Sequence, residues 1–208
     1  MQLKDGIDLK GHFSIISTKR DGSTVEYRDD NLIMDGAREN MAKLIGGVNT
    51  LDAGLQINKF VIGVRGHKLD NILDYKKVGS DGFDSTRTMM FSEEFKDEYY
   101  TIPFDVRGGL IVDTDDEENG IISDKCFNSK TPNIMETCSV KRTVSGRTCT
   151  YEITIGENSG NASASNTSII AYTEASLYAG DDIFSMKTFP ARVKEDSVQF
   201  KIIWSIIF

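Results

Sequence analysis

An acidic segment from Asp113 to Asp124 comes closest to a chemical site in this sequence. Read from Asp115, it places oxygen-bearing side chains at alternate positions, Asp115, Glu117 and Asn119, and a glycine follows them. This order is typical of a calcium-binding loop, in which carboxylate and amide oxygens coordinate the cation and the glycine allows a sharp turn.

Three features of the same segment argue against calcium. The position that needs a bidentate glutamate is Cys126, and Glu117 is longer than the aspartate usual at its place. The flanking residues also have the composition of strands, whereas such calcium loops lie between helices. We therefore expect an acidic hairpin tip that turns at Asn119-Gly120, without a tight calcium site, and we expect no cofactor elsewhere.

No other residues form a recognisable catalytic motif. The two histidines, His12 and His67, have no second histidine or cysteine at the spacing of metal ligands. The sequence has no nucleophile elbow, no zinc-protease motif and no phosphate-binding loop. A hydrolase with carboxylates from distant segments remains an alternative, but the sequence favours a non-enzymatic protein.

The three cysteines are Cys126, Cys138 and Cys149. An odd number without a closely spaced pair predicts neither a disulfide framework nor a zinc site. We expect three reduced, partly buried thiols in a protein made in a cytoplasm.

Composition limits the classes of partner. The 208 residues include 32 acidic and 24 basic side chains, which give a formal net charge of −8. Proteins that hold nucleic acid usually carry excess lysine and arginine, because neutralising phosphates supplies the affinity. Nucleic acid is therefore not expected to be the main partner. No apolar run approaches the length of a membrane-spanning helix, and the first residues lack the apolar segment of a secretion signal.

Hydrophobic periodicity predicts a mainly β protein: a β-sandwich of antiparallel strands with one short amphipathic helix. Strict alternation marks Val198 to Phe208, so we expect Trp204 in a core. Asp21-Gly22 and Ser145-Gly146 are turn signals between strands. The helix is expected to be capped by Asp35 and to bury one face. The helix is expected over residues 35–47, and its buried face consists of Ala37, Met41, Leu44 and Ile45. The expected strands are Gly11–Arg20, Ser23–Arg28, Ile57–Val64, Ile134–Thr143, Arg147–Ile155, Ile169–Tyr178 and Val198–Phe208.

We expect one domain over residues 1–208, whose core comes from 11–64 and 168–208. The residues between them, 65–167, are expected to form an insertion or lobe that carries most contacts to neighbouring subunits. Its aromatic residues lie among charges, and aromatic side chains are enriched at interface centres. The candidate interface residues are Phe91, Phe95, Tyr99 and Tyr100.

Both ends of the chain contain short motifs in a defined order. At the N-terminal end, Asn31-Leu32-Ile33 precedes Asp35-Gly36, an amphipathic helix and the run Ile57 to Gly63. At the C-terminal end, Thr173 to Gly180 precedes Thr188-Phe189-Pro190 and a final strand that contains Trp204. The order and spacing of these motifs resemble the pattern of virion structural proteins of tailed bacteriophages.

The resemblance implies a non-enzymatic subunit of the tail, baseplate, fibre-attachment or neck region. Such a subunit would assemble in the host bacterial cytoplasm and reside in the virion, as a homo-oligomer or ring with other virion proteins as partners and no membrane. The alternative is a receptor- or carbohydrate-binding β-sandwich, in which Tyr99, Tyr100 or Trp204 would stack on a sugar. The pattern that buries Trp204 speaks against that use of it.

Overall fold

The computed structural model describes residues 9–47, 55–104, 120–161 and 169–208, with the backbone alone for 120–124 and 131–135. The candidate calcium ligands Asp115, Glu117 and Asn119 lie outside these residues. The helices and strands are β1 (Lys10–Lys19), β2 (Thr24–Asp30), β3 (Leu32–Ile33), α1 (Asp35–Ile45), β4 (Ile57–Gly63), α2 (Phe91–Glu94), β5 (Tyr99–Pro103), β6 (Gly120–Asn128), β7 (Thr131–Ser145), β8 (Thr148–Ile155), β9 (Ile169–Ala179), β10 (Asp182–Glu195) and β11 (Val198–Ile207).

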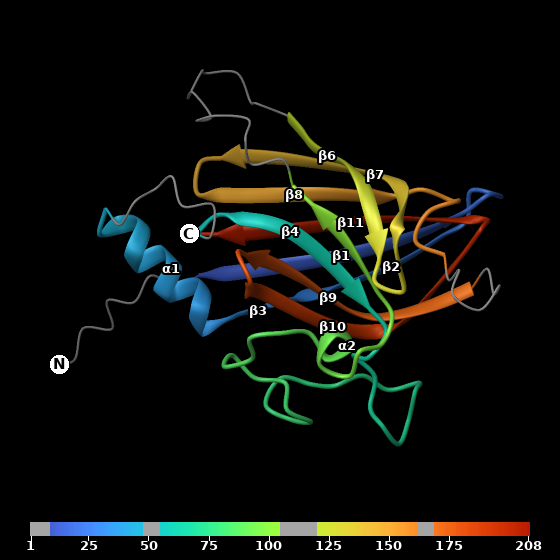
Figure 1. Cartoon of the computed structure of the whole chain (residues 1–208), viewed down its shortest axis with the longest axis horizontal. Helices are drawn as coiled ribbons and strands as arrows, with labels where there is room; N and C mark the ends of the chain where they lie inside the picture. The colour runs from blue at the N-terminus through green and yellow to red at the C-terminus, as the bar shows by residue number, and fades with distance from the viewer. Residues whose placement is uncertain (1–8, 48–54, 105–119, 162–168) are drawn as a thin grey trace.

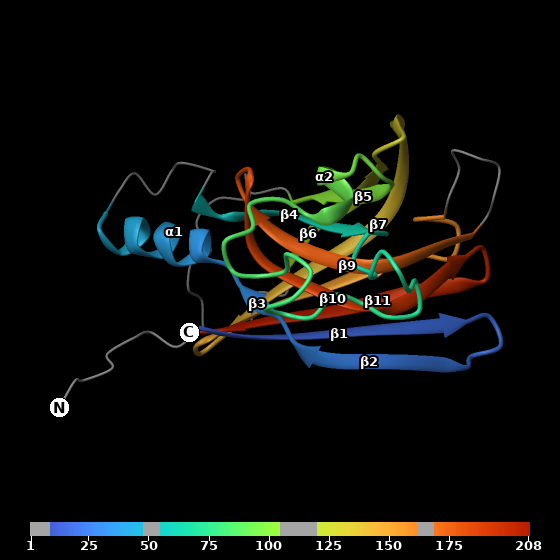
Figure 2. The same cartoon turned by 90° about the horizontal axis from the view of Figure 1, so that it is seen from below.

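The protein is mainly β, as predicted, and its strands form one antiparallel sheet. The order is β2-β1-β11-β8-β7-β6-β5-β4-β9-β10-β3. Figures 1 and 2 show the sheet curling so that its two halves face each other across one core, an arrangement between a sandwich and a barrel. Two predicted turns are present, with Gly22 and Gly146 at positive φ.

The continuous segment from β2 to β3 links the two edge strands of the sheet. β2 pairs with β1, and β3, which begins two residues after β2 ends, pairs with β10. Asn31 sits at the step between them, where its backbone N–H donates to Gly11 O at 3.0 Å. The Lys187 ammonium on β10 donates to Asp29 Oδ2 at 2.6 Å and to Asp30 O at 2.7 Å. These bonds hold the curled sheet nearly closed.

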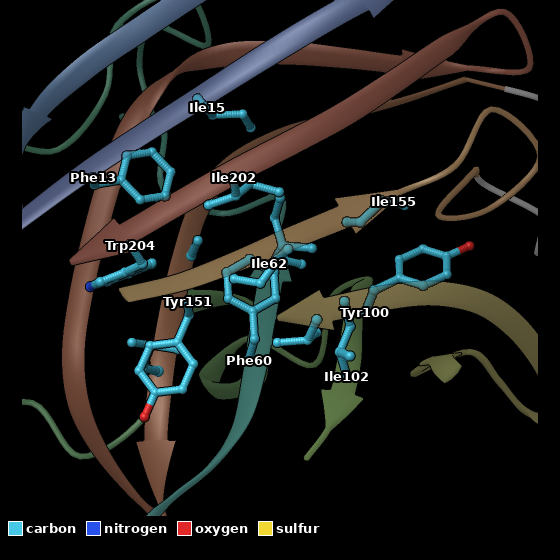
Figure 3. Packing of buried hydrophobic residues seen from close by; sticks show 14 of the residues in the cluster. Phe13, Ile15, Phe60, Ile62, Tyr100, Ile102, Tyr151, Ile155, Ile202 and Trp204 are labelled. Carbon is cyan, nitrogen blue, oxygen red and sulfur yellow. The ribbon is translucent and has the colours of Figure 1, made fainter. Parts of the chain in front are cut away.

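The core lies inside the curl (Figure 3). Trp204 is fully buried, and its ring packs edge-on against Phe13, with centroids 5.0 Å apart. Every second residue of β11 from Val198 to Ile206 is buried, which confirms the prediction for that strand. This alternation follows because strand side chains point to opposite faces in turn.

The expectation that the two ends of the chain form the core alone is wrong. β5, β6, β7 and β8 lie between β4 and β11 in the same sheet, so the middle segment is not a separate lobe. It supplies buried core residues such as Tyr100, Ile102, Val140, Ile153 and Ile155. Contiguity in sequence could not predict this, because strand pairing is decided by contacts between distant segments.

Two of the three cysteines form a disulfide, contrary to the expectation of free thiols. Cys126 on β6 and Cys138 on β7 are joined, with their Cα atoms 5.9 Å apart, and both are buried. The β6–β7 hairpin brings together two residues that are 12 apart in sequence. Cys149 is the unpaired cysteine.

The helix α1 forms where predicted, but its details differ. Met34 holds the cap position without a side-chain cap bond, so the assignment of Asp35 as cap is wrong; Asp35 instead pairs with Arg38 at 3.1 Å. Ala37 is buried, whereas Ile45 is 73% exposed. Figure 1 shows the C-terminal half of α1 extending beyond the sheet, so its last turn lies away from the described core.

Candidate interaction surface

The largest departure from the sheet is the chain between β4 and β5, residues 64–98, which we call the arm. In Figures 1 and 2 it lies outside the sheet alongside β9, β10 and β3. A second apolar cluster fills the space between the arm and the sheet and consists of Met34, Val61, Phe83, Met90, Phe91, Tyr178, Ile183 and Met186. The strand β9 is therefore buried on both faces, in contrast to the one-sided burial of β11.

A buried carboxylate anchors the arm to β9. Glu174 is fully buried, and its Oε1 accepts bonds from Ser92 N at 2.7 Å and from Ser92 Oγ at 2.5 Å. Its Oε2 accepts from Phe91 N at 3.0 Å. Burial raises the pKa of Glu174, and the hydrogen bonds from Ser92 and Phe91 oppose that shift. The carboxylate thus satisfies the first backbone donors of α2, which would otherwise be unpaired inside the protein.

Close backbone approach makes this anchor tight. A Cβ on Gly63 would lie 2.4 Å from Ser92 Oγ, and a Cβ on Gly66 would lie 2.2 Å from the Thr173 carbonyl oxygen. Lys76 is also buried; its ammonium donates to Arg65 O at 2.8 Å and lies 4.5 Å from the Phe91 ring centroid. Glycine at 63 and 66 lets the arm lie directly against the sheet.

The outermost part of the arm is the loop 67–75, which we call the tip loop. An isolated β-bridge between His67 and Tyr75 closes it. Inside it, Lys68 N donates to Asp74 O at 3.0 Å, and the Lys68 ammonium lies 2.6 Å from Asp74 Oδ2. Asn71 Oδ1 accepts from Leu73 N at 3.0 Å. These bonds give the tip loop a defined backbone.

Three large aliphatic side chains of the tip loop face solvent. Leu69 is 77% exposed, Ile72 64% and Leu73 85%. Single exposed aliphatic residues are common on protein surfaces, but several close together mark an interaction site. Because the loop is closed and internally bonded, its ordered backbone presents these residues to solvent. The tip loop is therefore the candidate interaction surface.

The structure separates the four predicted interface residues. Phe91 is buried in the second apolar cluster, between the arm and the sheet, and Tyr100 is buried in the main core. Assigning these two residues to an interface is therefore wrong. Tyr99 is half-buried against the second apolar cluster, and Phe95 is 49% exposed. Aromatic composition alone cannot distinguish a core ring from an interface ring. The tip residues were missed because aliphatic residues in a segment without periodicity give no local signal.

The described part of the chain offers few chemical sites. A shallow pocket of about 540 Å³ lies where β1, β2, β3 and α1 meet, and His12 Nδ1 lies 2.6 Å from Asp30 Oδ1 at its edge. Its lining, residues 9–12, 30–33 and 38, contains no hydroxyl or thiol side chain that could act as a nucleophile beside this pair. His67 Nδ1 lies 2.8 Å from Val64 O and helps to shape the tip loop.

Among the described residues, no group of three or more histidine, cysteine, aspartate or glutamate side chains is placed to hold a metal ion. No helix in this part of the chain is long and apolar enough to cross a membrane.

Comparison with known proteins found no relative of this chain. No protein-family model matches the chain. Searches of curated proteins and of solved structures also found no match.

Proposed function

We propose that this chain is a non-enzymatic structural subunit of a phage virion that assembles with itself and with other virion proteins, and that the tip loop forms one of its contacts. The observation that carries the assembly role is the exposed aliphatic group on a closed, anchored loop. The motif order at the two ends of the sequence supports the assignment to a tail, baseplate, fibre-attachment or neck component.

Burial of the tip would contribute substantially to an interface. Covering a leucine or isoleucine side chain contributes about 1.5–3 kcal/mol. Leu69, Ile72 and Leu73 together therefore represent a contact of several kcal/mol, before the entropy of association is subtracted. The hydrogen bond and the ion pair between Lys68 and Asp74 lower the ordering cost, because the backbone of the tip loop is already in place.

The carbohydrate-binding alternative has less support. Trp204 and Tyr100 are fully buried and cannot stack on a sugar, and Tyr99 is half-buried. A glycan-binding site would have to use other aromatic residues than those the sequence suggested.

Sedimentation velocity of the purified chain over a range of concentrations, with negative-stain microscopy of the same samples, tests the proposal. We expect concentration-dependent oligomers or rings. A variant that changes Leu69, Ile72 and Leu73 to serine should sediment as a monomer while keeping the circular dichroism of the parent.

The matched control changes three exposed valines outside the arm, Val25, Val144 and Val193, to serine and should assemble like the parent. If the tip variant assembles as well as the parent, the tip loop is not the contact. A parent protein that stays monomeric at all concentrations and binds glycans would replace the proposal with the carbohydrate-binding alternative.

A further inference from the structure

A buried lysine lies beside an asparagine side chain at one end of the sheet. Lys194 on β10 is completely buried, and its ammonium nitrogen Nζ lies 2.9 Å from Asn161 Oδ1. Its other acceptors are the carbonyl oxygens of Glu157 at 2.9 Å and Glu195 at 3.3 Å. None of the described carboxylates forms an ion pair with Lys194 within 4.0 Å. Among the described residues, the amine's hydrogen-bond partners are therefore neutral oxygens.

The segment that carries Asn161 is held firmly in place. Tyr100 donates its hydroxyl to Asn161 O, and Glu136 accepts from the backbone N–H of Gly160. Tyr172 donates its hydroxyl to Gly160 O at 2.7 Å. The Asn161 amide nitrogen Nδ2 donates to Asp196 Oδ1 at 2.7 Å and to Glu157 O at 3.0 Å. The amine and the carboxamide are thus each held by several bonds, and they share one acceptor, the Glu157 carbonyl oxygen.

This arrangement brings a nucleophile to an acyl group. Because Cγ of Asn161 is bonded to Oδ1, Nζ lies about 3–4 Å from that carbon, close to the separation from which bonds form. Burial lowers the pKa of Lys194 to about 8, and Glu136 and Asp196 oppose that shift. At neutral pH about a tenth of the amine is therefore uncharged and able to attack. A reaction that happens once per molecule and releases a product can proceed from such a fraction.

We propose that Lys194 and Asn161 form an intramolecular isopeptide bond. The lone pair of the neutral amine attacks Cγ of Asn161, a C–N bond forms, and the bond between Cγ and Nδ2 breaks. The amine gives up one proton and the departing nitrogen gains one, so the products are a secondary amide and one molecule of ammonia. No metal, oxidant or further reactant enters this balance.

Asp196 is the group placed to deliver a proton to the leaving nitrogen, and the proton given up by Nζ is released to solvent. Its carboxylate contacts Nδ2, the atom that leaves, and it is partly open to solvent, through which the ammonia can escape. The bond would tie the segment after β8 to the end of β10, two regions 33 residues apart in sequence. The inference stands independently of the proposed function, because it rests on the geometry at residues 161 and 194 alone.

Intact-mass spectrometry of the full chain under denaturing, reducing conditions tests the proposal. We expect a mass lower than that of the sequence by one ammonia molecule, either on purification or after prolonged incubation at pH 9. Tryptic peptides should include a branched product that joins the peptide of Asn161 to that of Lys194, with no cleavage after residue 194.

Variants distinguish isopeptide formation from a lysine that is buried but does not react. Lys194→Arg should keep the full mass, and Asp196→Asn should slow the loss of ammonia at least tenfold while leaving the circular dichroism unchanged. The matched control is Lys187→Arg, which alters another buried lysine, one paired with Asp29, and should leave the ammonia loss intact.

The mass and the tryptic cleavage of the parent protein test the proposal even if a variant fails to fold. A full sequence mass after incubation at pH 9, together with ordinary tryptic cleavage after Lys194, overturns the proposal. Loss of ammonia that persists in Lys194→Arg would also overturn it, because the reaction would then lie elsewhere.

Discussion

Replacing Glu174 by alanine should release the arm while the sheet stays folded. The change removes the acceptor of three buried donors, namely Phe91 N, Ser92 N and Ser92 Oγ. A buried donor left without a partner costs about 1–3 kcal/mol, so keeping the arm docked would cost at least about 3 kcal/mol. Since the arm can swing out and hydrate these groups, we expect local opening and not global unfolding.

Hydrogen exchange measured by mass spectrometry distinguishes the two outcomes. A cost of about 3 kcal/mol corresponds to roughly a hundredfold loss of protection, which we expect for amides of residues 83–95. Amides of β11 should stay strongly protected. The control Glu152→Ala removes a half-exposed carboxylate that pairs with Lys201 at 3.1 Å, and such surface pairs contribute about 0–1 kcal/mol. Unchanged protection of the arm in Glu174→Ala would refute the anchoring role, and equal loss in β11 would refute local opening.

The same carboxylate gives the anchor a pH dependence. The folded state raises the pKa of Glu174, so it holds the proton more tightly than the unfolded chain does. This group's contribution to stability is fully present below its ordinary pKa and is lost as pH rises through the folded pKa. Relative to Glu174→Gln, the parent should therefore gain urea stability on acidification from pH 8 towards pH 5. A constant difference between the two proteins across this range would show that Glu174 does not titrate there.

Three further predictions concern the core, the cysteines and the acidic segment. Trp204→Ala should destabilise the protein by about 3–5 kcal/mol in urea unfolding followed by circular dichroism, because it empties a fully buried site; a loss below about 1 kcal/mol would contradict its close packing. Alkylation of the denatured, unreduced chain should label Cys149 alone, and labelling of Cys126 and Cys138 as well would show that the disulfide is absent. Calorimetry should detect no micromolar calcium binding; binding that Asp115→Ala abolishes would reverse this expectation.

Local patterns in the sequence were sufficient for the strands that have one buried face. The alternation from Val198 to Phe208 predicted both β11 and the burial of Trp204, because side chains on a strand point to opposite faces in turn. Glycine-bearing turns at Gly22 and Gly146 were equally visible, since few other residues adopt positive φ there. These features depend on neighbours along the chain, which is why the sequence alone determined them.

Features that depend on distant segments were decided only by the tertiary structure. Phe91 and Tyr100 are core residues because the arm folds back onto β9 and because β5 joins the middle of the sheet. Cys126 meets Cys138 only through the pairing of β6 with β7. Lys194 meets Asn161 only when the end of β10 lies beside the segment that follows β8. These contacts are set by strand pairing and by the way the chain folds back on itself, so residue type could suggest their chemistry but not which residues meet.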